Sequence, residues 1–424
     1  MANIREIIDR RAVTTVFQPL VDMASGHVVG YEALSRGPAG SPWEAPAALF
    51  AAARAAGRED ELDWVCRARA YATALDAGLD PRLTLFVNME PTAWRTPCPP
   101  DLAPVVARAQ DRLTGDTERT ERAIARDPAA LLSATAACRD AGWGVALDDI
   151  GADPMSLALM PFVHPDVVKL DMQLLRSPED PHTARVVAAV AAYAESAGAV
   201  VLAEGIETAQ HLATARTMGA TVGQGWRFGR PAARPAGTAH PDTGALVPPR
   251  RNRADRPAAA GLTPYQIVSA ARPVTRTTKA DLMPLSRHFE ALAGDGPQPP
   301  VLLACFQDRR HFTPATARRF ARIAGHSPLV AALGAGMGEE PASGVRGARL
   351  GDGDPLRGEW NVVVVGPHQA VALVARDLGD TGAERDRRFD FAVTHDRALV
   401  VEAARSLLRW LAPAHGDLRV LAPV

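Results

Sequence analysis

The sequence predicts an α/β protein: a TIM-like (β/α)8 barrel with an antiparallel entry strand, followed by a separate α/β domain. Short apolar runs that each end in a polar residue alternate with helix-like segments, as in a parallel sheet buried on both faces. Before them, two strand-like runs flank the turn signal Ala24-Ser25-Gly26, which indicates an antiparallel hairpin. A proline-rich stretch separates the two domains.

The length of 424 residues accommodates one barrel and one smaller domain. Residues 232–259 hold five prolines and little apolar periodicity, so we assign 233–260 as a Pro/Arg-rich linker. Its arginines could touch an acidic partner, but a solvated linker is the favoured interpretation. The predicted domains are therefore 1–232 and 261–424.

Composition excludes several classes of partner and site. The net charge of −1 gives no field that would select DNA or a membrane surface. The four cysteines form no CxxC pair, which indicates a reducing compartment and no zinc ribbon. The N-terminus is too polar for a signal peptide, and no apolar run reaches about 18 residues, so we expect a cytoplasmic protein.

Polar residues stand where the predicted strands of the first domain end. In such barrels the chemistry lies at the C-terminal ends of the strands, so these side chains should converge. The set comprises Glu32, Asn88, Asp148, Asp149, Lys169 and Glu204, with Glu121 added from the run "ERTERA".

The carboxylates in this set predict a divalent metal site. Hard oxygen ligands from several strand ends suit Mg²⁺ or Mn²⁺, and the set contains no histidine, which makes zinc the weaker choice. The adjacent pair Asp148-Asp149 can serve two metal ions. Two such ions activate a water and stabilise the leaving oxygen in a phosphoryl displacement.

Lysine is rare in this chain. Only Lys169 and Lys279 occur among 47 basic residues, and the others are arginine. Drift in codon usage is one explanation for Lys169. The other is that a crowded site needs a compact ammonium, which a guanidinium fork cannot replace.

Each candidate also has a purely structural interpretation. Glu32 could be a surface residue, Asn88 and Asp148 could cap helices, and Glu204 could support a turn. Glu121 lies in a charge-rich run. The functional interpretation is favoured because all of them fall at the strand ends of one repeat.

The motif "YEALSR" at residues 31–36 resembles the signature of the EAL domain, the cyclic-di-GMP phosphodiesterase family. Further motifs follow in the family's order over residues 10–232. They are "FQPLVD" at 17, "VNM" at 87, "TER" at 120, "LDDIG" at 147, "KLD" at 169, "AEGIET" at 203 and "QGWRFGRP" at 224.

The resemblance implies a role for each candidate. Glu32, Asn88, Glu121 and Asp148 would bind metal, with Asp149 on the second of two ions. Lys169 would hold the nucleophilic water or a phosphate oxygen, and Glu204 would be the general base. Gln18, Arg36 and Gln224 would contact or line the dinucleotide site, and Glu207 would brace the loop after Asp149. The implied substrate is cyclic di-GMP, hydrolysed to linear pGpG, in a homodimer formed through the barrel.

Two departures from the family pattern leave alternatives open. The family's "DDFGTG" is "DDIGAD" here, and the run "LTGDTERTE" replaces an apolar strand, so we expect the strand at 114–119 to be short or distorted. The changed loop favours a receptor that binds cyclic di-GMP without cleaving it. The polar run favours a scaffold that binds neither metal nor nucleotide. The complete set of ligands favours the enzyme.

The C-terminal domain carries strand candidates at 301–306, 360–366 and 370–378. We interpret His395-Asp396 as a helix cap or turn, with a ligand pair as the alternative. The stretches "VLLACFQDRRHFTPATARRFARIA", "EWNVVVVGPHQAVALVARDLGD" and "RRFDFAVTHD" resemble the DICT sensory domain. That resemblance implies a regulatory module but does not identify its signal, and Lys279 remains without a role.

Overall fold

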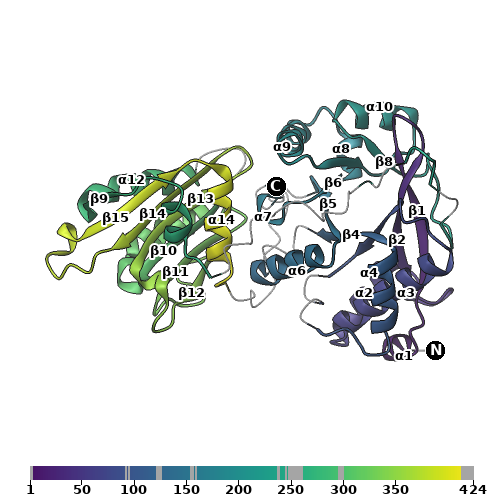
Figure 1. The fold of residues 1–424 in the computed structure, drawn as a ribbon, viewed down its shortest axis with the longest axis horizontal. Helices are drawn as coiled ribbons and strands as arrows, with labels where there is room; N and C mark the ends of the chain where they lie inside the picture. Colours follow the sequence, from purple (N-terminus) through teal and green to yellow (C-terminus); the bar gives the residue numbers. More distant parts are fainter. Residues whose placement is uncertain are drawn as a thin grey trace. The chain divides into compact units, whose positions relative to one another are not determined.

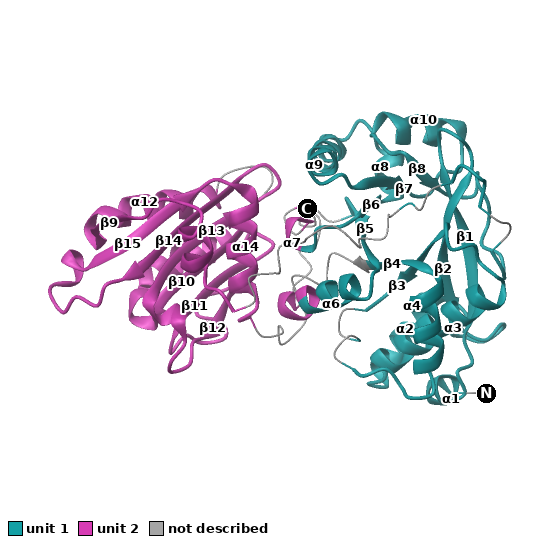
Figure 2. Ribbon diagram, viewed as in Figure 1, with its two compact units in different colours: residues 1–123, 133–152, 163–253 teal, residues 124–132, 153–162, 254–424 magenta. Residues whose placement is uncertain are grey.

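The computed structural model describes residues 3–90, 93, 96–120, 127–152, 157, 160–235, 239–243, 246, 261–294 and 300–411. The chain divides into two compact units, shown in separate colours in Figure 2. One unit contains 1–123, 133–152 and 163–253, and the other contains 124–132, 153–162 and 254–424. The predicted linker lies largely outside the described residues, so its boundaries stay a prediction.

The N-terminal part is a closed eight-stranded barrel, as the alternating pattern predicts (Figure 1). The first strand runs antiparallel to both of its neighbours, and the other neighbouring strands are parallel. The strands are β1 (Thr14–Asp22), β2 (Val28–Arg36), β3 (Thr84–Asn88), β4 (Thr114–Thr120), β5 (Gly144–Ile150), β6 (Val167–Leu170), β7 (Val200–Ala203) and β8 (Val222–Gln224).

Helices connect the parallel strands, and local sequence signals set their ends. The Asp180 side chain accepts a hydrogen bond from the His182 N–H at the start of α9, Pro181 is the first helical residue, and Gly198 ends the helix at φ +67°. The described helices of this part are α1 (Ile4–Asp9), α2 (Pro46–Ala55), α3 (Glu59–Asp76), α4 (Ala103–Arg112), α6 (Pro128–Asp140), α7 (Met160–Val163), α8 (Met172–Arg176), α9 (Pro181–Ala197) and α10 (Ala209–Thr217).

A layer of apolar side chains fills the barrel interior. It draws one residue from almost every strand, and all of them are buried: Leu20, Val29, Phe86, Ala146, Val167, Leu202 and Val222. This packed layer makes the barrel a solid core, so ligands are confined to its mouth.

Strand β4 is neither short nor distorted, so that expectation was wrong. It pairs in continuous parallel register with β3, from Thr84↔Thr114 to Asn88↔Glu118, and with β5 over five residue pairs. Its polar side chains do not prevent this pairing because the ladder is made by backbone groups. The Trp143 ring occupies the space where a side chain at position 115 would lie. The ring supplies apolar contact that the strand itself lacks.

Gly115→Ala should destabilise the barrel, because a Cβ there would lie 2.5–2.7 Å from carbon atoms of the Trp143 ring. We expect the free energy of unfolding to fall by about 1–3 kcal/mol, the usual range for overpacking. Urea unfolding of the single variants and of Gly115→Ala combined with Trp143→Leu measures it. The cost of Gly115→Ala should shrink in the Trp143→Leu background; an equal cost in both backgrounds would contradict the close packing.

The C-terminal part is a seven-stranded mixed sheet in the order β12-β11-β10-β13-β14-β15-β9. The three strands predicted from the sequence are β10, β13 and β14. The elements are α11 (Pro264–Ser269), β9 (Thr275–Thr278), α12 (Lys279–Leu292), β10 (Val301–Asp308), η3 (Arg309–His311), α13 (Pro314–Ala324), β11 (Val330–Ala335), β12 (Val345–Arg349), η4 (Pro355–Gly358), β13 (Glu359–Val365), β14 (Ala370–Asp377), η5 (Glu384–Asp386), β15 (Arg388–Thr394) and α14 (Arg397–Leu408).

Helices cover both faces of this sheet. Leu282 and Phe289 of α12 and Phe320 of α13 pack with alternate strand residues such as Leu302, and α11 and α14 contact the sheet as well. Asp396 caps α14 by accepting from the N–H groups of Ala398 and Leu399, which confirms the cap interpretation of the His395-Asp396 pair. None of the described helices combines the length and apolar character needed to cross a bilayer.

Candidate active site at the barrel mouth

Most of the predicted site residues lie two positions beyond the interior apolar layer. Because side chains of a strand alternate between its faces, a residue two positions later points to the same face, one step nearer the mouth. The pairs are Phe86 and Asn88, Ala146 and Asp148, Val167 and Lys169, Leu202 and Glu204, and Val222 and Gln224. The period-two pattern of the strands therefore assembles the site.

Lys169 lies at the centre of this ring. Its side chain is 0 % exposed, and its Nζ lies 2.7 Å from Glu204 Oε1, 2.8 Å from Glu118 Oε1 and 2.9 Å from Asp148 Oδ1. A fourth carboxylate, Glu32, is 3.5 Å away. Burial alone would lower the pKa of Lys169, but these carboxylates raise it well above its usual value. The ammonium is therefore charged at neutral pH.

Side-chain amides orient the Glu32 carboxylate. Asn88 Nδ2 donates to Glu32 Oε1 at 3.2 Å, and Gln224 Nε2 donates to Glu32 Oε2 at 2.6 Å. Burial would raise the pKa of Glu32, but Lys169 and these hydrogen bonds lower it below its usual value. Because Asn88 donates through nitrogen, its amide oxygen remains available to a cation.

The Asp148-Asp149 pair forms a β-bulge. Leu147 pairs with Val168, and the next pair is Ile150 with Leu170, so both aspartates stand opposite Lys169. Asp149 adopts φ +58°, which is uncommon for a residue with a side chain. The bulge lets both adjacent carboxylates face the mouth, and oxygens of Asp148, Asp149 and Glu204 lie within 4.8 Å of one another.

Glu118 is a site residue that the sequence analysis missed. It is fully buried, its register partner on β3 is Asn88, and it forms an ion pair with Lys169. The prediction chose Glu121 because the polar run was not interpreted as a regular strand. Counting "TGDTERT" as a strand would have found Glu118, two residues after Asp116. Glu121 lies outside the described residues, so its role stays a prediction.

The remaining predicted residues lie around this centre. Gln18 accepts a hydrogen bond from Gln224 and donates to the Gly229 carbonyl. Arg36 lies on β2 four residues beyond Glu32 and forms no ion pair within the described part of the chain. Glu207 is exposed, and since residues 153–156 are not described, its predicted bracing of that loop stays untested.

Two known families match the sequence, one in each part of the chain. The model of the EAL domain family matches residues 1–231, more than half of the chain. The chain belongs to the EAL domain family. The DICT family, described as a "Sensory domain in DIguanylate Cyclases and Two-component system", matches residues 264–378. Both resemblances inferred from the sequence are thereby confirmed.

Named relatives of the EAL domain include phosphodiesterases. The "Probable cyclic di-GMP phosphodiesterase PdeB" of Escherichia coli is 26% identical over 236 residues, which cover 54% of this chain and 44% of the relative. "Cyclic di-GMP phosphodiesterase PA2567" of Pseudomonas aeruginosa is 29% identical over 228 residues, covering 51% and 38%. The matched region thus spans less than half of each relative.

A solved structure gives a further comparison. The manganese and cyclic-di-GMP complex of Klebsiella pneumoniae BlrP1 is 29% identical over 52% of this chain and 56% of that one, with a TM-score of 0.46.

The donor set of the EAL barrel fits a divalent metal ion. Four carboxylates lie within 3.5 Å of one ammonium and Asp149 lies beside two of them, so ionised groups leave a large surplus of negative charge: Glu32, Glu118, Asp148, Asp149 and Glu204. Glu118 Oε1 lies 2.8 Å from the Lys169 ammonium, and neither oxygen of this carboxylate accepts a hydrogen bond of good geometry from another described residue. Buried carboxylate oxygens without hydrogen-bond donors are suited to a cation.

The pKa values of these carboxylates report the same surplus. Burial, followed by the charge of Glu32, raises the pKa of Glu118 well above its usual value. Burial likewise raises the pKa of Glu204 to about 8, although Lys169 opposes the shift. Burial and then Asp148 raise the pKa of Asp149. Without metal, the site holds protons that a bound cation would displace.

Metal binding should therefore stabilise the barrel more as pH rises. The pKa of Glu204, about 8, lies above its ordinary 4.5, so the folded chain retains a proton that the unfolded chain releases between these values. Stability of the metal-free protein should decrease as pH rises through this window. Thermal melts with EDTA and with Mn²⁺, from pH 6 to 9, measure both effects.

Glu204→Gln should weaken the pH dependence of the metal-free protein, because it removes one of the titrating carboxyls. Glu195→Gln, at an exposed position of α9, serves as the matched control and should leave the dependence unchanged. A melting temperature that is equally sensitive to pH with and without Mn²⁺ would contradict the assignment of a metal site.

Proposed function

We propose that the EAL barrel hydrolyses cyclic di-GMP to linear pGpG with two divalent cations, Mg²⁺ or Mn²⁺. Two relatives that match this region carry the name of cyclic di-GMP phosphodiesterases. The observation that carries the proposal is the single buried ammonium of Lys169, with four carboxylates from four other strands within 3.5 Å. A structural ion pair needs one carboxylate, whereas a phosphodiesterase centre needs several.

The residues that would hold the first ion are Glu32, Asn88, Glu118 and Asp148, and Asp149 would serve the second. Bound cations would supply an activated water and neutralise charge on the scissile phosphate. Glu118 is assigned here in place of Glu121, because its carboxylate is buried beside Lys169 at the level of Asn88.

Lys169 would stabilise charge on the phosphate, and Glu204 would accept a proton. The compact ammonium would donate to a phosphate oxygen or to the attacking water, since its position is fixed by the surrounding carboxylates. Among the four carboxylates that surround Lys169, Glu204 is the least buried, with 21% of its side chain exposed. A bound cation would displace the proton that this carboxyl holds in the metal-free site, which would leave the carboxylate free to take a proton from water.

Recognition and regulation would involve other parts of the chain. Arg36, which forms no ion pair with any described residue, would contact the dinucleotide, and Gln18 and Gln224 would line the site. The chain would form a homodimer through the barrel, and the C-terminal domain would control the activity of the barrel. The altered loop is compatible with the barrel, because Ile150 is fully buried and keeps its ladder partner Leu170.

Lys169→Arg should abolish turnover while the protein stays folded, because a guanidinium is larger than the space between these carboxylates. We expect a loss of about 100-fold or more in the rate of pGpG formation from cyclic di-GMP with Mn²⁺. Arg69→Lys, on the exposed side of α3, is the control for a charge-preserving exchange. Full activity of Lys169→Arg would refute the role given to the ammonium. Tight nucleotide binding without product in the wild type would instead support the receptor.

Glu118→Gln and Glu121→Gln distinguish the structural assignment from the prediction made on the sequence. We expect Glu118→Gln to weaken Mn²⁺ binding by about 10–100-fold and to remove turnover. Isothermal titration with Mn²⁺ measures the affinity independently of activity. If only Glu121→Gln weakened Mn²⁺ binding, the assignment of Glu118 as a ligand would be wrong.

A further inference from the structure

The C-terminal domain contains a cavity of about 330 Å³. Its walls come from α12, the end of β10, η3, α13, β13 and η5. All of these elements belong to the same compact unit, so the cavity is independent of the barrel.

One wall of the cavity is apolar and rigid. Phe306 and Trp360 line it and are 7% and 8% exposed. The Phe306 ring meets the rings of Phe312 and Phe320 edge to face at centroid distances of 5.1 and 5.5 Å, and Trp360 meets Phe389 at 5.7 Å. Fixed aromatic surfaces favour a flat apolar body, because little side-chain entropy is lost on binding.

The polar part of the lining is cationic. Four basic side chains and two carboxylates line the cavity, a surplus of positive charge in a chain whose net charge is −1: Lys279, Arg287, Arg310, Arg319, Glu290 and Glu384. The ion pairs of Glu290 with Arg319 and of Glu384 with Lys279 use both carboxylates.

Two arginines therefore remain for a ligand. Arg287 and Arg310 form no ion pair with a carboxylate in the described part of the chain, although both line the cavity. His311 also lines the cavity. Burial, and then the charge of Lys279, lower the pKa of His311, and its imidazole therefore adds no charge at neutral pH. The unused charge of this cavity is thus carried by guanidinium groups, which bind carboxylates and phosphates through paired hydrogen bonds.

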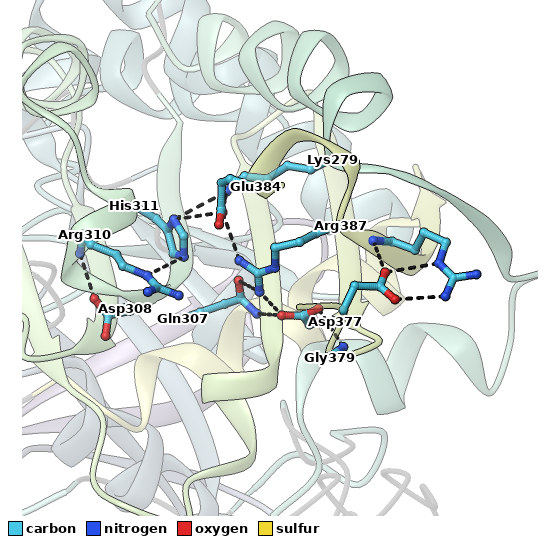
Figure 3. A network of polar contacts seen from close by, with 11 residues as sticks. Lys279, Gln307, Asp308, Arg310, His311, Asp377, Gly379, Glu384 and Arg387 are labelled. Atoms are coloured by element: carbon cyan, nitrogen blue, oxygen red, sulfur yellow. Dashed lines mark hydrogen bonds and ion pairs between the residues drawn. The ribbon is translucent and has the colours of Figure 1, made fainter. Parts of the chain in front are cut away.

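The rim of the cavity is held in a strained arrangement. Gln307 adopts φ +63° in a bulge of β10. Cys305 pairs with Leu333 of β11 and the next pair is Asp308 with Ala335, so β10 holds one extra residue here. Its amide donates to Asp377 Oδ2 at 3.1 Å. Figure 3 shows how this contact continues through Arg387 and Glu384 to Lys279. Backbone strain that a network maintains is typical of ligand sites.

We propose that this cavity is the ligand-binding site of the C-terminal domain and takes a small organic anion: a carboxylate or phosphate monoester on a flat apolar body. The body would lie on Phe306 and Trp360, and the anionic group would meet Arg287 and Arg310. A volume at the lower end of the usual range of about 300–1,000 Å³ selects a small metabolite over a dinucleotide. Lys279 thereby gains a role, because its pair with Glu384 closes the rim.

Isothermal titration of the full chain with three probes tests the proposal. The probes are 1-naphthoate, 1-naphthyl phosphate and the uncharged 1-naphthalenemethanol, which share one ring system. We expect at least one anion to bind about tenfold more tightly than the alcohol. The preferred anion then identifies the head group.

Arg287→Ala combined with Arg310→Ala should weaken anion binding by about tenfold or more and leave the alcohol unaffected. Both arginines are exposed, so the fold should persist. Arg318→Ala, at another exposed arginine, this one on α13, is the control. Ala315→Trp should block all three probes, because Ala315 lines the cavity. Failure of every probe, equal binding of anions and alcohol, or anion binding that is unchanged in the double variant would overturn the proposal.

Discussion

The buried ammonium of Lys169 is the interaction on which the barrel mouth depends. A charge without solvent is costly unless several groups compensate it, and here carboxylates from β2, β4, β5 and the end of β7 do so. Glu118 is fully buried and the other three carboxylates have at most 21% of their side chains exposed, so each in turn requires the ammonium or a further cation. The ring therefore couples the ends of five strands, and a defect in the register of any one strand would leave unpaired charge in the core.

The polar strand β4, a departure from the usual family pattern, pairs regularly within the barrel. Polar residues in β4 are tolerated because the strand ladder is a backbone property and because Trp143 fills the space beside Gly115. The same polar strand delivers Glu118 to Lys169. A run that resembled a weak strand is thus a regular strand whose buried charge belongs to the site.

The two lysines of the chain show two uses of one cation. Lys169 has no exposed surface and faces four carboxylates, which stabilise a permanent charge at the barrel mouth. Lys279 is 16% exposed and pairs with Glu384, whose side chain is half exposed on η5. The first network is centred on a fully buried ammonium, whereas the second lies at the rim of a cavity. A rim ion pair of this kind can open at small cost, because water screens it.

The sequence by itself determined the barrel, its antiparallel entry and most of its mouth, because apolar runs, turn residues and strand-end positions are local properties. It placed Glu32, Asn88, Asp148, Lys169 and Glu204 correctly at one end of the sheet. Only the tertiary structure decided what depends on register and packing: the continuous β4 and the buried Glu118, the bulge that turns Asp148 and Asp149 toward the same mouth, and the cavity beside Lys279. These features arise from residues far apart in the chain, and local periodicity carries no information on how such residues meet.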